Sequence, residues 1–212
     1  MPIIIDNQPD KKTRLGVWQI TETVEQLEAS VFLSEKEKAV LATFKHDKSK
    51  KHWLSYRALI RQLCGDAFSV HYSDFGKPYL HNEEQSQHIS ITHSGDFSAV
   101  IINPDTSVGI DIEEVSRRIE RVAPRFLSEK ELVFIDRNNF LEHLTICWTA
   151  KEALFKISGN DYYDFREQIN LLPFGFSRKG VLRAVLNGES GMMELQVYFE
   201  KIEEYYLSFV VA

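Results

Sequence analysis

The chain has 212 residues, a formal net charge of -6 and 43% hydrophobic residues. This content supports a packed core and excludes a wholly disordered chain, while the acidic balance argues against a general nucleic-acid coat. No apolar run reaches the roughly 20 residues of a membrane span, and the first residues lack the length and charge of a signal peptide, so we expect a cytoplasmic protein with no nucleic-acid or membrane partner.

The predicted elements alternate between helices and strands along the chain. Capping boxes at Ser34 and Ser128, each with a glutamate three residues later, predict two helix starts. Longer helices are expected over residues 49–64 and 145–158, each followed by a glycine at the position of a C-terminal cap. Strands are expected over residues 69–72, 89–92, 97–102, 108–113, 181–186, 194–199 and 206–211.

Three segments of the first half recur in the same order in the second half. Residues 15–18 match 108–111, residues 32–38 match 126–132, and residues 53–61 match 148–156. One repeat at about half the chain length predicts two similar halves in tandem rather than a solenoid, which needs three or more units.

The predicted fold class is therefore α+β, with two similar tandem α/β halves. Each half would pack a helical segment on a small, mainly antiparallel sheet. A turn-forming cluster at residues 103–106 separates the two predicted domains, 1–106 and 107–212. Because no flexible linker joins the halves, we expect them to pack tightly, with the active site at their interface.

The strand over residues 108–113 is the first candidate for chemistry. Its alternation places Asp111 and Glu113 together on one face and three aliphatic side chains on the other. Carboxylate oxygens are the ligands that Mg²⁺ prefers. An amphipathic strand with a solvated face explains the same pattern.

The helix over residues 145–158 is the second candidate. Glu152 and Lys156 are four residues apart and therefore share a helix face. They form either an exposed ion pair, or a site in which Glu152 is a third carboxylate and Lys156 reaches phosphate oxygens. The repeat favours the site, because Glu152 replaces Arg57 of the first copy and Asp111 replaces a tryptophan.

Two turns and a basic stretch offer groups that bind phosphate. Thr92 and His93 precede a glycine-containing turn, and their side chains together with the backbone amides of the turn can donate to a phosphate. An ordinary solvated turn explains the same residues. Pro78 holds Lys77 extended, either toward an anionic ligand or as the start of a strand. Residues 36–61 hold eight basic and two acidic residues, which indicates an anionic ligand on the first half or a solvated helix face.

Four motifs in this order resemble the 4'-phosphopantetheinyl transferase superfamily. They are FGKP (Phe75–Pro78), ITHSG (Ile91–Gly95), GIDIE (Gly109–Glu113) and WTAKEALFKISG (Trp148–Gly159). The last has the family's W-[ST]-x-K-E-[AS]-x-x-K-x-x-G form at every specified position. Thr92 stands where many members have serine, a change that keeps the hydroxyl. The duplicated length resembles the surfactin-synthetase-activating type, which is monomeric with its site between the halves.

The resemblance implies transfer of phosphopantetheine from coenzyme A to a serine of an apo acyl or peptidyl carrier protein, with release of adenosine 3',5'-bisphosphate. It implies an Mg²⁺ site at Asp111, Glu113 and Glu152. Lys156 would neutralise the phosphoryl group, and Glu152 or Glu113 would accept the serine proton. The residues implied to bind coenzyme A are Arg57, Gly76, Lys77, Pro78, Thr92, His93, Asp111 and Lys156.

Such carriers are acidic, so the resemblance also predicts a basic docking surface. The candidates are Arg117, Arg118, Arg121, Arg125 and Lys130, with Phe126 and Leu127 as apolar contacts. Two other functions fit the same motifs: a non-catalytic module that binds coenzyme A or a carrier, and a metal-dependent phosphohydrolase that uses water instead of serine. The complete set of acids together with Lys156 favours the transferase, because a binding module does not need all of them.

Overall fold

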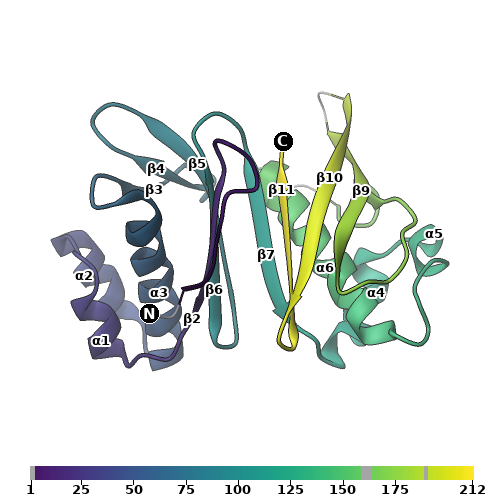
Figure 1. Ribbon diagram of the computed structural model, residues 1–212, viewed down its shortest axis with the longest axis horizontal. Helices are drawn as coiled ribbons and strands as arrows, with labels where there is room; N and C mark the ends of the chain where they lie inside the picture. Colours follow the sequence, from purple (N-terminus) through teal and green to yellow (C-terminus); the bar gives the residue numbers. More distant parts are fainter. Residues whose placement is uncertain (1–2, 159–163, 189–190) are drawn as a thin grey trace.

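Two antiparallel sheets stand face to face in the middle of the molecule, and helices cover their outer faces (Figure 1). The structure is a computed structural model that describes residues 3–158, 164–188 and 191–212. Each half of the chain supplies one sheet and the helices that cover it. The predicted α+β architecture of two tandem halves is therefore confirmed.

The first half forms a six-stranded sheet in the order β1-β2-β6-β5-β4-β3. Its strands are β1 (Ile3–Asn7), β2 (Arg14–Gln19), β3 (Ser69–Tyr72), β4 (Pro78–His81), β5 (Ser86–Ser94) and β6 (Phe97–Asn103). Its helices are α1 (Val24–Ala29), α2 (Glu35–Thr43) and α3 (Asp47–Cys64). Helix α3 is the long helix that packs on this sheet.

The second half forms a five-stranded sheet in the order β7-β11-β10-β9-β8. Its strands are β7 (Val108–Glu114), β8 (Ile169–Leu171), β9 (Lys179–Gly188), β10 (Gly191–Ile202) and β11 (Tyr205–Val211). Its helices are α4 (Arg118–Phe126), α5 (Glu129–Leu132) and α6 (Phe140–Ser158). None of the helices in the described ranges is both long and apolar enough to cross a membrane.

Local sequence signals account for most element boundaries. The capping boxes at Ser34 and Ser128 are both present, with the serine side chain accepting from the N3 amide and the N3 glutamate returning to the cap. Helix α3 ends before Gly65, as expected, whereas Gly159 lies outside the described residues. Helix α6 begins at Phe140, earlier than predicted, because buried side chains such as Leu144 extend its apolar face.

Three layers of buried side chains hold the molecule together. One cluster lies between α1–α3 and the first sheet, and a second lies between the second sheet and α4–α6. The third joins the two sheets, with Leu15, Val17 and Phe97 facing Val108, Ile110 and Ile112 of β7. Strand β7 therefore lies at the seam between the halves, with one face on the first sheet and the other on α6.

Candidate functional site

Hydroxyl side chains of β5 cover the outer edge of β7. Strand β7 is the edge strand of its sheet, so its outward amides have no neighbouring strand to bind. The Ser90 Oγ accepts from the Ile110 amide at 3.1 Å, and the Thr92 Oγ1 accepts from the Ile112 amide at 3.4 Å. These bonds join the halves at the end of the seam where the candidate acids lie.

The same strand reaches the two acids of β7. Because side chains alternate along β5, Thr92 and Ser94 share the face that is turned to β7. The Thr92 hydroxyl donates to Asp111 Oδ1 at 2.9 Å, and the Ser94 hydroxyl donates to Glu113 Oε2 at 2.8 Å. Ser94 was not among the predicted site residues, although the alternation that selects Thr92 also selects it.

Lys156 connects α6 to β7. Its Nζ lies 2.8 Å from Asp111 Oδ1 and 2.8 Å from the carbonyl oxygen of Ile110. Lys156 of α6 therefore forms its ion pair with Asp111 of β7 rather than with Glu152 on its own helix. The structure thus brings the predicted residues of the strand and of the helix together.

Glu152 and Glu113 are acids that the site makes hard to ionise. Burial, followed by the negative charge of Asp111, raises the pKa of Glu152 to about 7, against the opposing effect of Lys156. Burial also raises the pKa of Glu113, although the hydrogen bond from Ser94 acts in the opposite direction. Three carboxyl groups, those of Asp111, Glu113 and Glu152, therefore interact with the single ammonium group of Lys156.

Asp111 has an oxygen that fits a cation. Its Oδ2 is buried and has no hydrogen-bond partner, whereas Oδ1 accepts from Thr92 and Lys156. A buried carboxylate oxygen needs a donor or an ion, and hard oxygen donors suit Mg²⁺. Across the described ranges, no three His, Cys, Asp or Glu side chains already stand in metal-site geometry. The magnesium site at Asp111, Glu113 and Glu152 therefore stays a prediction.

A pair of stacked imidazoles lies beside these acids. The His93 and His52 rings are parallel within 18° with centroids 4.3 Å apart, and His52 Nε2 lies 2.8 Å from the Gly95 carbonyl oxygen. Burial lowers the pKa of His93 to about 4, and the charges of His52, Lys156 and Lys48 contribute. His93 is therefore neutral at pH 7. His52 belongs to no motif, so no sequence pattern identifies it.

The predicted segment Gly76-Lys77-Pro78 reaches the C-terminal end of α6. Gly76 has a φ of 77°, which favours glycine, and Pro78 begins β4. The Lys77 Nζ donates to the Ile157 carbonyl oxygen at 2.9 Å, and burial lowers the pKa of Lys77. A cation at this position complements the helix dipole, so Lys77 ties the first half to the helix that carries Lys156.

Arg57 is bound elsewhere in the first half. Its Nε lies 3.2 Å from Glu37 Oε1, and its guanidinium lies 3.4 Å above the centroid of the Trp53 ring. The pocket beside it is lined by Glu37, Arg61 and Asp66 among others, and by none of the predicted seam residues. The structure therefore does not group Arg57 with Thr92, and its role toward coenzyme A stays a prediction.

The basic residues of the predicted docking surface are exposed, whereas the two apolar residues predicted for it are buried. The exposed basic residues are Arg117, Arg118, Arg121, Arg125 and Lys130. Phe126 and Leu127, in contrast, are each 1% exposed. The Phe126 ring packs edge-on against Trp148 at a centroid distance of 4.9 Å, so these side chains belong to the core and offer no contact to a partner.

The high pKa of Glu152 predicts a loss of stability with rising pH. Since its pKa is about 7 in the folded state and 4.5 for an ordinary glutamate, the folded state binds this proton more tightly, and the stabilisation is lost as the pH rises from 4.5 through 7. Without divalent ions, we expect Glu152→Gln to be more stable than the parent at pH 8 by on the order of 2 kcal/mol and equal to it at pH 4.5.

Urea denaturation of both proteins at the two pH values measures this difference. The matched control is Glu28→Gln, which changes an exposed glutamate and should give the same difference at both pH values. Equal stability of the parent and Glu152→Gln at pH 8 would contradict the raised pKa of Glu152.

Comparisons with known proteins give one consistent family. A family model described as the 4'-phosphopantetheinyl transferase superfamily matches residues 107–210. The chain is 29% identical over 94 residues to the 4'-phosphopantetheinyl transferase gsp of Aneurinibacillus migulanus, covering 43% of this chain and 38% of the relative. It is 28% identical over 149 residues to the 4'-phosphopantetheinyl transferase psf-1 of Bacillus pumilus, covering 64% of this chain and 61% of the relative.

A third relative has a similar degree of likeness. The chain is 27% identical over 115 residues to the 4'-phosphopantetheinyl transferase AcpT of Escherichia coli strain K12, covering 52% of this chain and 58% of the relative. In each case the matched part spans less than two thirds of the relative's own length. The family match itself contains Asp111, Glu113, Glu152 and Lys156.

Proposed function

The chain belongs to the 4'-phosphopantetheinyl transferase superfamily, and from this we propose that it transfers phosphopantetheine from coenzyme A to a serine of an apo carrier protein. The observation that carries the proposal is the convergence of Asp111 from β7 and Lys156 from α6 at the seam. Residues 1–106 would supply contacts to coenzyme A, and residues 107–212 would supply the acids and the catalytic helix.

Displacement at phosphorus needs positioned groups and neutralised charge. The serine oxygen would form a bond to the β-phosphorus while the bond from that phosphorus to the bridging oxygen breaks and adenosine 3',5'-bisphosphate leaves. Glu152 or Glu113 would accept the serine proton, and a pKa of about 7 suits Glu152 for proton transfer near neutral pH. Lys156 would turn its ammonium group toward the phosphoryl oxygens.

Coenzyme A would be held mainly by groups of the first half. Thr92 and His93 would donate to its phosphates, with Asp111 and Lys156 beside them, and the Gly76-Lys77-Pro78 segment would line the adenine side. A neutral His93 can donate one hydrogen bond to a phosphate. Arg57 is kept as a further candidate, on the family resemblance alone.

Magnesium would be held by Asp111, Glu113 and Glu152. The unpartnered Asp111 Oδ2 and the crowding of carboxylates support this assignment. A bound Mg²⁺ would neutralise negative charge on the pyrophosphate during transfer.

One experiment separates this function from the two alternatives. The protein is incubated with coenzyme A, Mg²⁺ and an apo carrier protein, and the carrier is then weighed by mass spectrometry. A transferase yields a carrier that is heavier by one phosphopantetheine. A binding module leaves carrier and coenzyme A unchanged, and a phosphohydrolase consumes coenzyme A without a carrier; either result would overturn the proposal.

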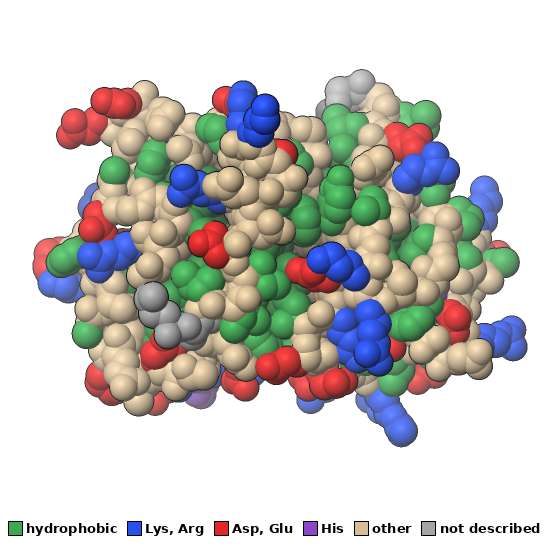
Figure 2. Space-filling view, viewed as in Figure 1, with side chains coloured by type: hydrophobic (Ala, Val, Ile, Leu, Met, Phe, Trp, Pro, Cys, Tyr) green, Lys and Arg blue, Asp and Glu red, His purple; other side chains and the backbone are tan. Residues whose placement is uncertain are grey.

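We propose that the carrier docks on the arginines of α4. Acidic and basic side chains are interspersed on the face shown in Figure 2. Helix α4 exposes Arg118, Arg121 and Arg125 against one exposed glutamate, Glu120, and Arg117 precedes it. A surface with an excess of one sign steers an oppositely charged partner and raises its association rate. An acidic carrier is such a partner.

Charge reversal tests this docking surface. Arg118→Glu combined with Arg121→Glu should raise the KM for the carrier by about tenfold or more and leave the affinity for coenzyme A unchanged, because rim charges act mainly on association. Steady-state kinetics and calorimetry measure the two quantities. Lys11→Glu with Arg137→Glu makes the same change of charge at other exposed positions and should leave the KM unchanged. An equal loss of coenzyme A affinity in the α4 variant would contradict a separate carrier surface.

A further inference from the structure

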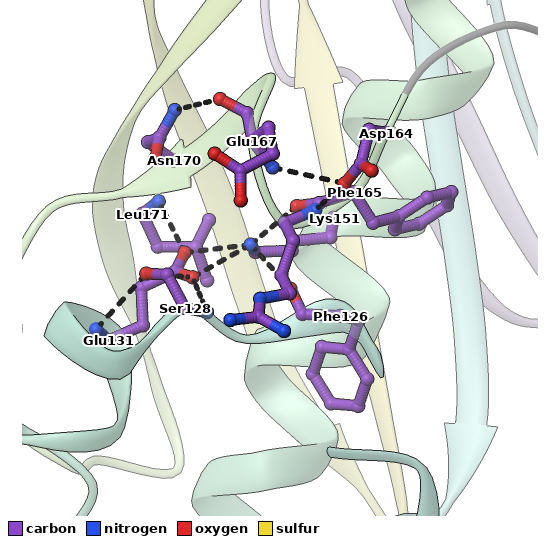
Figure 3. A network of polar contacts seen from close by, with 10 residues as sticks. Phe126, Ser128, Glu131, Lys151, Asp164, Phe165, Glu167, Asn170 and Leu171 are labelled. Atoms are coloured by element: carbon purple, nitrogen blue, oxygen red, sulfur yellow. Dashed lines mark hydrogen bonds and ion pairs between the residues drawn. The ribbon is translucent and has the colours of Figure 1, made fainter. Parts of the chain in front are cut away.

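Lys151, the residue before Glu152 on α6, is a buried cation to which the proposed function assigns no role. Its side chain is 0% exposed, and its Nζ donates to the carbonyl oxygens of Phe126 and Phe165, each at 2.7 Å. It also lies 2.8 Å from Glu131 Oε1 (Figure 3). One ammonium group thus joins α6 to the end of α4, to α5 and to the segment before β8.

Glu131 extends these connections. Its carboxylate accepts from the Ser128 amide and hydroxyl at 2.8 and 2.9 Å, which forms the capping box of α5. It also accepts from the Leu171 amide at 2.9 Å (Figure 3). The contacts of Lys151 and Glu131 join α6 to α4, α5, β8 and the segment before β8, so the pair fixes these elements relative to one another.

Aromatic side chains close the network from outside. The Phe165 ring stacks against Trp148 at 5.8 Å and against Phe155 at 5.1 Å, both on α6. Phe126 packs edge-on against the same tryptophan. Phe126 and Phe165, whose carbonyl oxygens bind Lys151, therefore also pack their rings against α6. Their contacts, Trp148 and Phe155, come before and after Glu152 in the sequence.

The duplication shows what is specific to the second half. In the first half the capping-box glutamate, Glu37, pairs with Arg57 of α3. Arg57 is the counterpart of Glu152 in the repeat, and Glu131 is the counterpart of Glu37. In the second half the cation stands one residue earlier, at Lys151. Both halves therefore have an ion pair between the long helix and a capping-box glutamate, and in the second half the position after the cation is occupied by Glu152.

We propose that Lys151 is a positioning residue: its three hydrogen bonds fix the rotation of α6, and thereby hold Glu152 against Asp111 and Glu113. A buried ion pair is weak evidence for stability, since a well-packed neutral replacement is often as stable. The support for a positioning role is that Lys151 contacts three other segments of the second half. The inference rests on the proposed transferase function, because the geometry served is that of the transfer site.

The test compares a single and a double substitution. Lys151→Met leaves Glu131 buried and unpaired, and should lower the melting temperature by about 6–20 °C. In the double variant, Glu131→Gln with Lys151→Met, both charges are removed and the glutamine retains the capping box. Its melting temperature should therefore be close to that of the parent. We expect kcat in the double variant to stay about 100-fold below the parent, with coenzyme A affinity within threefold, because the bonds to Phe126 and Phe165 are not restored.

A matched control uses the same helix. Lys201 on β10 pairs with Glu142 near the start of α6, and Lys201→Met should lower the melting temperature without changing kcat. A double variant whose kcat returns with its melting temperature would overturn the proposal, since Lys151 would then contribute stability alone.

Hydrogen exchange separates this inference from the proposed function. Lys151→Met should speed amide exchange in residues 148–156 and 126–131, and Lys201→Met should not. Unchanged exchange in both segments would overturn the role of Lys151 whether or not the protein transfers phosphopantetheine. If the parent transfers nothing and exchange is still faster in Lys151→Met, the transferase function would be overturned while the role of Lys151 in fixing α6 would be supported.

Discussion

Glu152→Gln is expected to reduce phosphopantetheine transfer by about 10²–10⁴-fold while the fold stays intact. The substitution keeps the shape of the side chain and removes its charge, which both a proton acceptor and a magnesium ligand require. Among the described residues Glu152 receives no hydrogen bond that would be lost, and its ionisation is opposed by burial and by Asp111. Activity and stability should therefore separate in this variant.

The measurement is the initial rate of carrier modification, read by mass spectrometry, together with the melting temperature. The control is Glu142→Gln, a glutamate near the start of the same helix that pairs with Lys201 away from the seam. It should keep the parent kcat and lose some stability. A Glu152→Gln protein with more than about a tenth of the parent rate would exclude Glu152 as proton acceptor and as magnesium ligand.

Asp111→Ala is a less clear test than Glu152→Gln. Asp111 is 5% exposed and its carboxylate accepts from Thr92 and from Lys156, so its removal takes an acceptor from the buried Thr92 hydroxyl and leaves Lys156 with the Ile110 carbonyl oxygen. A loss of activity in this variant would combine chemistry with a disturbed interface between β7 and α6.

What the sequence predicted well depends on local periodicity. Alternation in residues 108–113 placed Asp111 and Glu113 on the side opposite to the aliphatic residues, and helical spacing placed Glu152 and Lys156 on one face. The repeat then predicted two halves with a shared seam. Each of these signals lies within one element or in the comparison of two copies, so the chain order alone contains it.

What the sequence missed depends on contacts between elements. His52 and His93 stack across α3 and β5, and Lys151 reaches carbonyl oxygens of two other segments. Neither contact has a spacing that a sequence pattern would reveal. The prediction that Phe126 contacts a carrier was wrong for a related reason. Phe126 follows exposed arginines in the sequence, but it is buried at the end of α4, because the direction of the side chain turns by about 100° with each residue of a helix.

The close packing of α6 on β7 gives a prediction that combines a large loss of stability with a large loss of activity. A Cβ atom placed on Gly109 would lie 1.9 Å from the backbone carbonyl oxygen of Ala153 on α6. A backbone atom of a buried helix cannot turn aside as a side chain can, so Gly109→Ala forces the helix away from the strand. We expect a loss of about 3 kcal/mol in the free energy of unfolding, at the upper end of overpacking effects.

The repeat supplies the matched control for this variant. Gly16 on β2 is the counterpart of Gly109, and a Cβ placed there would lie 2.7 Å from Leu59 Cδ1, the end of a flexible side chain. Leu59 can change rotamer, so Gly16→Ala should cost about 1 kcal/mol and leave kcat near that of the parent. Gly109→Ala should also lower kcat by about 100-fold, since a shift of α6 by about 1 Å separates Lys156 from Asp111. Urea denaturation and carrier kinetics measure both effects; similar losses in the two variants would show that the contact between β7 and α6 can relax, and that the seam acids do not depend on it.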